Sequence, residues 1–195
     1  YDNFAVNTAK APLYPVRADI VKSDEDNIKD ILVKRYSLHE LHSYVWTYND
    51  EYKALGIDVC DNIKLLNATN PNIETIRNAI IPTQLCQVKY NTGYAPDFGV
   101  FEIGRIVDGV DKNNMCIEKK NLAITLFSKT QDITTTYLKW RDIIATIVDD
   151  IKHKEVSFKK EEATESYQHI KNLNGIYADG VRLGNMGIVH PTVSK

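Results

Sequence analysis

The chain has 195 residues, of which 43% are hydrophobic and 26% are charged, and its formal net charge is −2 at pH 7. This length suits one large domain with a substantial buried core. No apolar run approaches the roughly 18 residues that a membrane-spanning helix needs, and the chain lacks the basic excess of a protein that neutralises many phosphates. A membrane role is therefore not expected, and any nucleic-acid contact would have to be local.

The cysteines and the chain ends bear on where the protein resides. Cys60, Cys86 and Cys116 lie far apart without paired spacing, which favours reduced thiols in the cytoplasm over a disulfide framework. The chain opens at Tyr1 without an initiator Met, a basic segment or an apolar signal core. We therefore expect no export signal, and we expect both ends to be cut points within a longer protein.

The N-terminal part is predicted to be a connector followed by a helix. Residues 1–19 contain Pro12 and Pro15 and show no sustained periodicity, which indicates an extended connector from a preceding domain, so that the globular domain covers residues 20–195. Ser23 is a suitable N-cap, and acidic residues followed by apolar residues at helical spacing predict a helix over residues 24–36.

The next stretch alternates between short strands and helices. Residues 39–48 are rich in aromatic and branched side chains and predict a strand, followed by a short helix that ends at Gly56. Residues 63–66 predict another short strand. Pro82 suits the first turn of a helix that runs to about Tyr90. The residues expected on the buried side of that helix are Leu85, Val88 and Cys86.

The second half carries the strongest patterns. Residues 98–107 and 122–127 predict two antiparallel strands, and residues 135–153 predict a long helix capped by the threonines at its start. Asp179-Gly180 is a two-residue hairpin signal near the end of the chain. The helix residues expected to be buried are Leu138, Ile144 and Val148. The fold class predicted is α+β, with a mainly antiparallel sheet of about five to seven strands and the long helix on one face.

No residue pattern predicts a catalytic, cofactor-binding or metal site. His39 and His42 lie three apart on a predicted strand, where they would face opposite sides and could not share a metal. Gly180 and its neighbouring glycines lack the Lys and the following helix of a phosphate-binding loop. The basic pairs Lys119-Lys120 and Lys159-Lys160 are interpreted as solvated surface.

Two segments stand out for the density of their features. Residues 77–82 lead directly into the predicted helix, and residues 101–107 place Glu102 and Arg105 inside an otherwise apolar strand. Three interpretations of this charged pair are open: a structural ion pair, a polar strand face, or part of a binding pocket.

These segments are also where a family resemblance begins. The motifs that carry it are Leu65-Leu66-Asn67, Thr75-Ile76-Arg77, Ile80-Ile81-Pro82 with Leu85, Val88-Lys89-Tyr90-Asn91, Val100-Phe101-Glu102-Ile103-Gly104-Arg105, Tyr137-Leu138-Lys139 and Gly187-Ile188-Val189-His190-Pro191. In order and spacing they resemble the core module of the bacterial phenylalanine–tRNA ligase β subunit. The chain departs from the usual family pattern at Asn78-Ala79, Thr83 and Trp140, which indicates a divergent member or a paralogue.

The resemblance implies a class II aminoacyl-tRNA synthetase-like fold, an antiparallel sheet flanked by helices, here truncated at its C-terminal end. It also implies that the β-subunit core has lost the ATP-handling arginines, so Arg77 and Arg105 are not expected to be catalytic. The active site, with ATP and magnesium, would belong to the α subunit of an (αβ)₂ enzyme that charges tRNA with phenylalanine. The isolated chain would then be inactive and its role architectural.

The expected partner is the α subunit, with tRNA contacted only through the whole enzyme. The residues predicted to bind the partner are Arg77, Ile80, Ile81, Pro82 and Leu85, because a rigid helix start beside branched apolar side chains suits a contact surface. The alternative is that both isoleucines are core residues. In the isolated chain a homomeric contact could replace the α subunit. Two other functions remain as alternatives: a stand-alone class II ligase that uses ATP, and a β-subunit-like paralogue that binds an amino acid or RNA.

Overall fold

The computed structural model describes residues 3, 10–17, 19–57 and 63–194. Its helices are α1 (Ile20–Asp30), the π-helical turn η1 (Ile31–Arg35), α2 (Asn49–Ala54), the 3₁₀ turn η2 (Pro71–Ile73), α3 (Ile81–Asn91) and α4 (Ile133–Lys152). Its strands are β1 (His39–Glu40), β2 (Trp46–Thr47), β3 (Ile63–Lys64), β4 (Thr75–Ile76), β5 (Asp97–Val110), β6 (Cys116–Ser128), β7 (Val156–Lys160), β8 (Gln168–Ala178) and β9 (Val181–Val189). The mixed α+β class is confirmed.

The strands form three small sheets within these residues, in the orders β1-β5-β6, β2-β4-β3 and β7-β8-β9. Every pairing is antiparallel except that of β1 with β5. The prediction of one sheet with five to seven strands is therefore wrong. A principal reason is that residues 39–48 do not form one strand, because β1 pairs with β5 and β2 pairs with β4 in a separate sheet.

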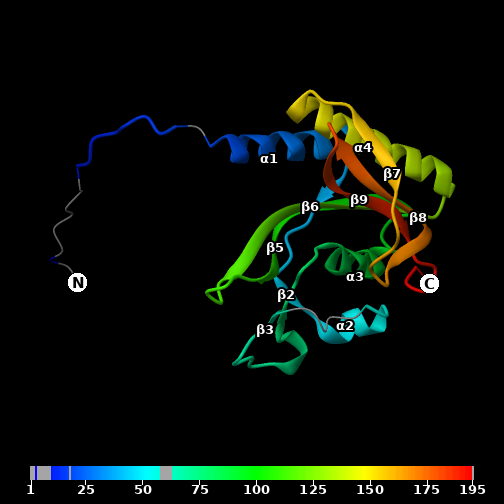
Figure 1. Cartoon of the computed structure of the whole chain (residues 1–195), viewed down its shortest axis with the longest axis horizontal. Helices are drawn as coiled ribbons and strands as arrows, with labels where there is room; N and C mark the ends of the chain where they lie inside the picture. Colours follow the sequence, from blue (N-terminus) through cyan, green and yellow to red (C-terminus); the bar gives the residue numbers. More distant parts are fainter. Residues whose placement is uncertain (1–2, 4–9, 18, 58–62, 195) are drawn as a thin grey trace.

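The long ribbon of β5 and β6 divides the molecule into two layers (Figure 1). On one side lie α1 and α4, and on the other side lie α3 and α2. Phe101 and Ile124 are register partners that face the α4 side and belong to the main hydrophobic core, together with buried residues of α4, β8 and β9. Their neighbours Glu102 and Ala123 point to the α3 side, because successive residues of a strand face opposite ways.

The first helix exists as predicted but begins earlier. Asp19 is its N-cap and accepts hydrogen bonds from the backbone amides of Val21 and Lys22 at 3.0 and 3.3 Å. Ser23, the predicted cap, instead donates its backbone N–H to the Asp19 carbonyl inside the first turn. The start predicted at residue 24 is therefore wrong, because an equally good cap stands one turn upstream.

The long helix α4 is confirmed, with one correction to its buried face. Asp132, not a threonine, caps it by accepting from the Thr135 amide at 2.9 Å. Ile144 and Val148 are buried, each 8% exposed, as predicted, but Leu138 is 55% exposed. At 100° per residue Leu138 lies about 100° around the helix from the midpoint of these two residues, so it faces solvent.

Two other predictions from the sequence, a helix and a hairpin, are confirmed. The helix started by Pro82 is α3, and Leu85, Cys86 and Val88 are buried in it as predicted. The terminal hairpin is confirmed: β8 and β9 meet at Asp179 and Gly180, whose φ angles of 49° and 78° suit the two-residue turn.

Three further expectations concern the N-terminal connector, Cys60 and membrane-spanning helices. Residues 10–17 are exposed and form neither helix nor strand, while the division at residues 19 and 20 stays a prediction. Cys60 lies outside the described residues. No helix among those described is long and apolar enough to cross a membrane.

Candidate functional site

The centre of the α3-side layer is a buried arginine at the end of β4. Arg77 is 1% exposed. Its backbone N–H donates to the Val45 carbonyl at 2.8 Å, and its own carbonyl accepts from the Val107 amide at 3.0 Å. The main chain at this position therefore links the segment before β2 to the long strand β5, which fixes where the side chain starts.

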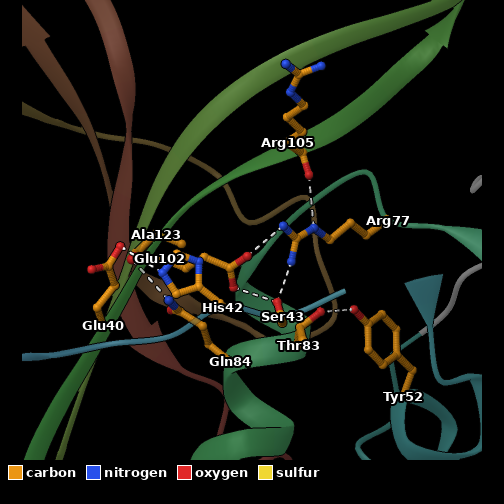
Figure 2. Close-up of polar contacts among 10 residues, drawn as sticks. All are labelled: Glu40, His42, Ser43, Tyr52, Arg77, Thr83, Gln84, Glu102, Arg105 and Ala123. Carbon is orange, nitrogen blue, oxygen red and sulfur yellow. Dashed lines mark hydrogen bonds and ion pairs between the residues drawn. The ribbon is translucent and has the colours of Figure 1, made fainter. Parts of the chain in front are cut away.

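Figure 2 shows that the Arg77 guanidinium is surrounded by acceptors from the same chain. Nε donates to the Arg105 carbonyl at 3.0 Å, Nη1 donates to Ser43 Oγ at 2.6 Å, and Nη2 donates to Glu102 Oε1 at 2.7 Å. Ser43 Oγ in turn donates to the second carboxylate oxygen of Glu102 at 2.6 Å. Arg77, Ser43 and Glu102 thus form a closed ring of charge-assisted hydrogen bonds, the buried arginine cluster.

The ring is buried, so each of its two charges depends on the other for stabilisation. The Arg77 and Glu102 side chains are only 2% and 3% exposed. A buried charge without a partner is strongly unfavourable, whereas a paired and hydrogen-bonded one is tolerated. The geometry therefore assigns the pair to holding β4, β5 and the Ser43 segment together.

The three interpretations of Glu102 and Arg105 can now be compared with the structure. Both residues are in ion pairs, but not with each other: Arg105 Nη1 lies 2.7 Å from Glu118 Oε2 on β6, and both of these side chains are more than half exposed. A three-residue step along a strand places Glu102 and Arg105 on opposite faces. The same spacing rule was applied to His39 and His42 in the sequence. Applied to Glu102 and Arg105, it would have shown that these two residues do not pair with each other.

A glycine closes the buried arginine cluster on its remaining side. A Cβ atom at Gly104 would collide with Nη2 of Arg77 and with the Glu102 carboxylate. Since both of those groups are held by hydrogen bonds, the absence of a side chain at position 104 is what leaves room for the ion pair.

Helix α3 lies on the same side of the β5–β6 ribbon as the cluster and bonds directly to β6. Gln84 is fully buried; its Nε2 donates to the Ala123 carbonyl at 3.1 Å and its Oε1 accepts from Thr125 Oγ1 at 2.8 Å. Tyr52 of α2 lies 2.7 Å from Thr83 Oγ1, and burial raises the pKa of Tyr52 to about 12. Burial likewise raises the pKa of the Cys86 thiol to about 12. Ser43 and Gln84 were not identified from the sequence, because only their three-dimensional contacts distinguish them.

The structure places most of the predicted partner-binding residues inside the chain. Arg77, Ile80, Pro82 and Leu85 are buried, and Ile81 is half-buried. Ile80 is 2% exposed and packs against Ile106 and Ala123. This is the arrangement that the core alternative describes for Ile80, while contact of the segment with a partner stays a prediction.

The two histidines considered for a metal have other surroundings. His39 belongs to β1, opposite Val100. His42 Nε2 lies 3.2 Å from Glu40 Oε1, which also pairs with Lys29 Nζ at 2.6 Å. Among the described residues, no three His, Cys, Asp or Glu side chains gather in an arrangement that could hold a metal ion.

The fold and the buried arginine cluster together define a class of protein: an α+β domain in which, over the described part of the chain, the buried charged side chains of Arg77 and Glu102 pair with each other. The family model described as the phenylalanyl tRNA synthetase beta chain CLM domain matches residues 7–195. The chain therefore belongs to this family, and the resemblance found in the sequence is confirmed. No curated protein matches the chain.

Proposed function

We propose that this domain is a non-catalytic structural core of the phenylalanine–tRNA ligase β subunit, and that it packs against the α subunit in an (αβ)₂ enzyme. Membership in the beta chain family supports the synthetase context. The α subunit would handle phenylalanine, ATP and magnesium, and tRNA would be contacted by the whole enzyme in the cytoplasm. The class II-like character of the sheet is part of the same proposal.

The buried arginine cluster is the single observation that carries the non-catalytic role. A synthetase arginine that stabilises the α-phosphate of ATP must present its guanidinium to the ligand. In Arg77, Nε, Nη1 and Nη2 instead donate hydrogen bonds to the Arg105 carbonyl, Ser43 and Glu102, respectively. Arg105 points to the opposite face and pairs with Glu118. Neither arginine of the two family-like segments fits an ATP phosphate.

The burial pattern refines the proposed contact with the α subunit. Arg77, Ile80, Pro82 and Leu85 would act by ordering the segment from the inside. Ile81 is half-buried between two apolar clusters, so it is the member of the predicted set that a partner can reach. We propose Ile81, at the start of α3, as the point of contact.

The test combines binding with an activity assay. The purified chain, immobilised, should retain the cognate α subunit, and alone it should not support phenylalanine-dependent exchange of pyrophosphate into ATP. Ile81→Asp should weaken retention, whereas Val181→Asp, on the exposed β8–β9 hairpin, should not. Both variants are first checked for retained folding by circular dichroism.

The outcomes separate the competing functions. Exchange by the chain alone would establish a stand-alone ligase. Failure to retain the α subunit, together with binding of phenylalanine or RNA by the chain alone, would establish the paralogue that acts as a binding module. Wild-type retention by folded Ile81→Asp would move the contact surface away from α3.

A further inference from the structure

Residues 10–17 lie beyond the N-terminal end of α1, away from the three sheets (Figure 1). They are exposed along their whole length and form neither helix nor strand. The larger apolar side chains of this stretch face water: Leu13, Tyr14 and Val16 are 101%, 77% and 92% exposed. Exposed apolar side chains gathered in one place mark a candidate contact site, so this stretch is a candidate for binding a partner outside the domain.

Two prolines restrict the backbone of this stretch before any partner is present. The rings of Pro12 and Pro15 hold φ at about −65°. The residues before them, Ala11 and Tyr14, are pushed by the same rings toward extended conformations. The backbone from residue 11 to residue 15 is thus biased toward polyproline II geometry, a left-handed helix with about three residues per turn. We call residues 11–17 the proline segment.

The spacing of the prolines repeats one binding element twice. Because polyproline II repeats about every three residues, Ala11 and Tyr14 lie on one edge of the segment and Pro12 and Pro15 lie on the next edge. The segment therefore presents the dipeptide Ala11-Pro12 and, one turn later, the dipeptide Tyr14-Pro15. Protein domains that recognise proline-rich sequences bind Pro-x-x-Pro segments of this kind in grooves lined with aromatic side chains.

The positive charges near the prolines differ in the edge on which they lie. Arg17 follows Tyr14 by three positions, so it continues the edge that carries Ala11 and Tyr14. Lys10 precedes Leu13 by three positions and lies on the third edge, away from both dipeptides. A groove that holds the dipeptides therefore meets the Arg17 guanidinium and not the Lys10 ammonium group.

We propose that the proline segment binds a separate protein domain of the SH3 type, whose groove has two aromatic-lined sites followed by an acidic group. The two dipeptides occupy the two sites, and the Arg17 guanidinium pairs with the acidic group through charge-assisted hydrogen bonds. The entropy lost on binding is small, because the prolines already restrict the free segment. This inference is independent of whether the domain contacts an α subunit.

Nuclear magnetic resonance with an isotope-labelled SH3 domain tests the proposal. The SH3 domain is one that binds Pro-x-x-Pro-x-Arg peptides, and a free peptide of residues 10–17 serves as the positive control. The resonances of its groove should shift when the peptide, the 195-residue chain or the intact β chain is added. Pro15→Ala and Arg17→Glu, each made in the intact β chain, should remove these shifts.

The third edge of the segment supplies a matched control for each variant. Leu13→Ser removes an exposed apolar side chain and Lys10→Glu reverses a charge, but both positions face away from the groove. Both control variants should therefore shift the groove resonances as the wild type does. All four substitutions alter exposed residues, so their urea unfolding curves should coincide with that of the wild type.

Each contrary outcome overturns the proposal. If the free peptide does not bind, the sequence lacks the chemistry assigned to it. If the peptide binds and the intact β chain does not, the segment is covered by another part of that chain. If Pro15→Ala or Arg17→Glu shifts the resonances as the wild type does, or if Leu13→Ser removes the shifts, the contact is not made by the edges that polyproline II geometry assigns.

Discussion

Removal of the Arg77 guanidinium tests whether the buried arginine cluster stabilises the fold. Arg77→Met keeps an unbranched side chain but leaves the Glu102 carboxylate, 3% exposed, with Ser43 as its remaining side-chain partner. Breaking a buried ion pair by removing one member costs about 3–5 kcal/mol. Since total stabilities are about 5–15 kcal/mol, this one change should remove a large part of the free energy of unfolding.

Arg105→Met is the matched control. Its nitrogen-to-carboxylate distance is also 2.7 Å, but the Arg105 and Glu118 side chains are 68% and 52% exposed. Exposed ion pairs contribute no more than about 1 kcal/mol, because water screens them. The two variants therefore differ in burial and not in the length of the ion pair.

Urea unfolding followed by circular dichroism measures both free energies. The double variant Arg77→Met with Glu102→Met should be less destabilised than the sum of its single variants, because neither charge is then left alone. If Arg77→Met lost less than about 1 kcal/mol, or as little as Arg105→Met, the structural role given to the cluster would be wrong.

Three further expectations rest on burial and on one shifted pKa. Ile144→Ala should cost about 2–5 kcal/mol in urea unfolding and Leu138→Ala well under 1 kcal/mol, since only the first side chain is buried; equal losses would contradict the helix orientation. Under native conditions iodoacetamide should label Cys116, which is exposed, and spare Cys86 until the chain unfolds, as read by peptide mass spectrometry. An arginine partner lowers the pKa of Glu161 to about 2, so its stabilisation is present above the unfolded value of about 4.3 and is lost as pH falls toward 2. Glu161→Gln should thus destabilise at pH 7, by no more than about 1 kcal/mol for a partly exposed pair, and match the wild type near pH 2.

Local signals in the sequence were sufficient to predict those elements whose structure depends on one short segment. The Asp179-Gly180 turn and the start of α3 at Pro82 depend on backbone preferences of a few neighbouring residues, and both were predicted. The start of α1 failed for an equally local reason, because Asp19 and Ser23 are both good caps and the sequence does not rank them.

Pairings between distant segments were beyond what the sequence could indicate. His39 pairs with Val100 in parallel, and no local pattern specifies that partner. The Arg77–Glu102 pair has the same origin: the sequence marked both residues as unusual, but only the fold brings them together. Strand alternation alone could have excluded a bond between Glu102 and Arg105.

The glycine beside the buried arginine cluster carries a consequence for how relatives of this chain can diverge. Position 104 cannot gain a side chain while Arg77 and Glu102 occupy the space in front of it. Loss of either charged residue alone leaves the other buried without its partner, and an added methyl group at position 104 displaces both. We therefore expect these three positions to change as a linked set: a lineage that replaces the ion pair with apolar side chains is freed to accept alanine at position 104, and a lineage that keeps the pair is not.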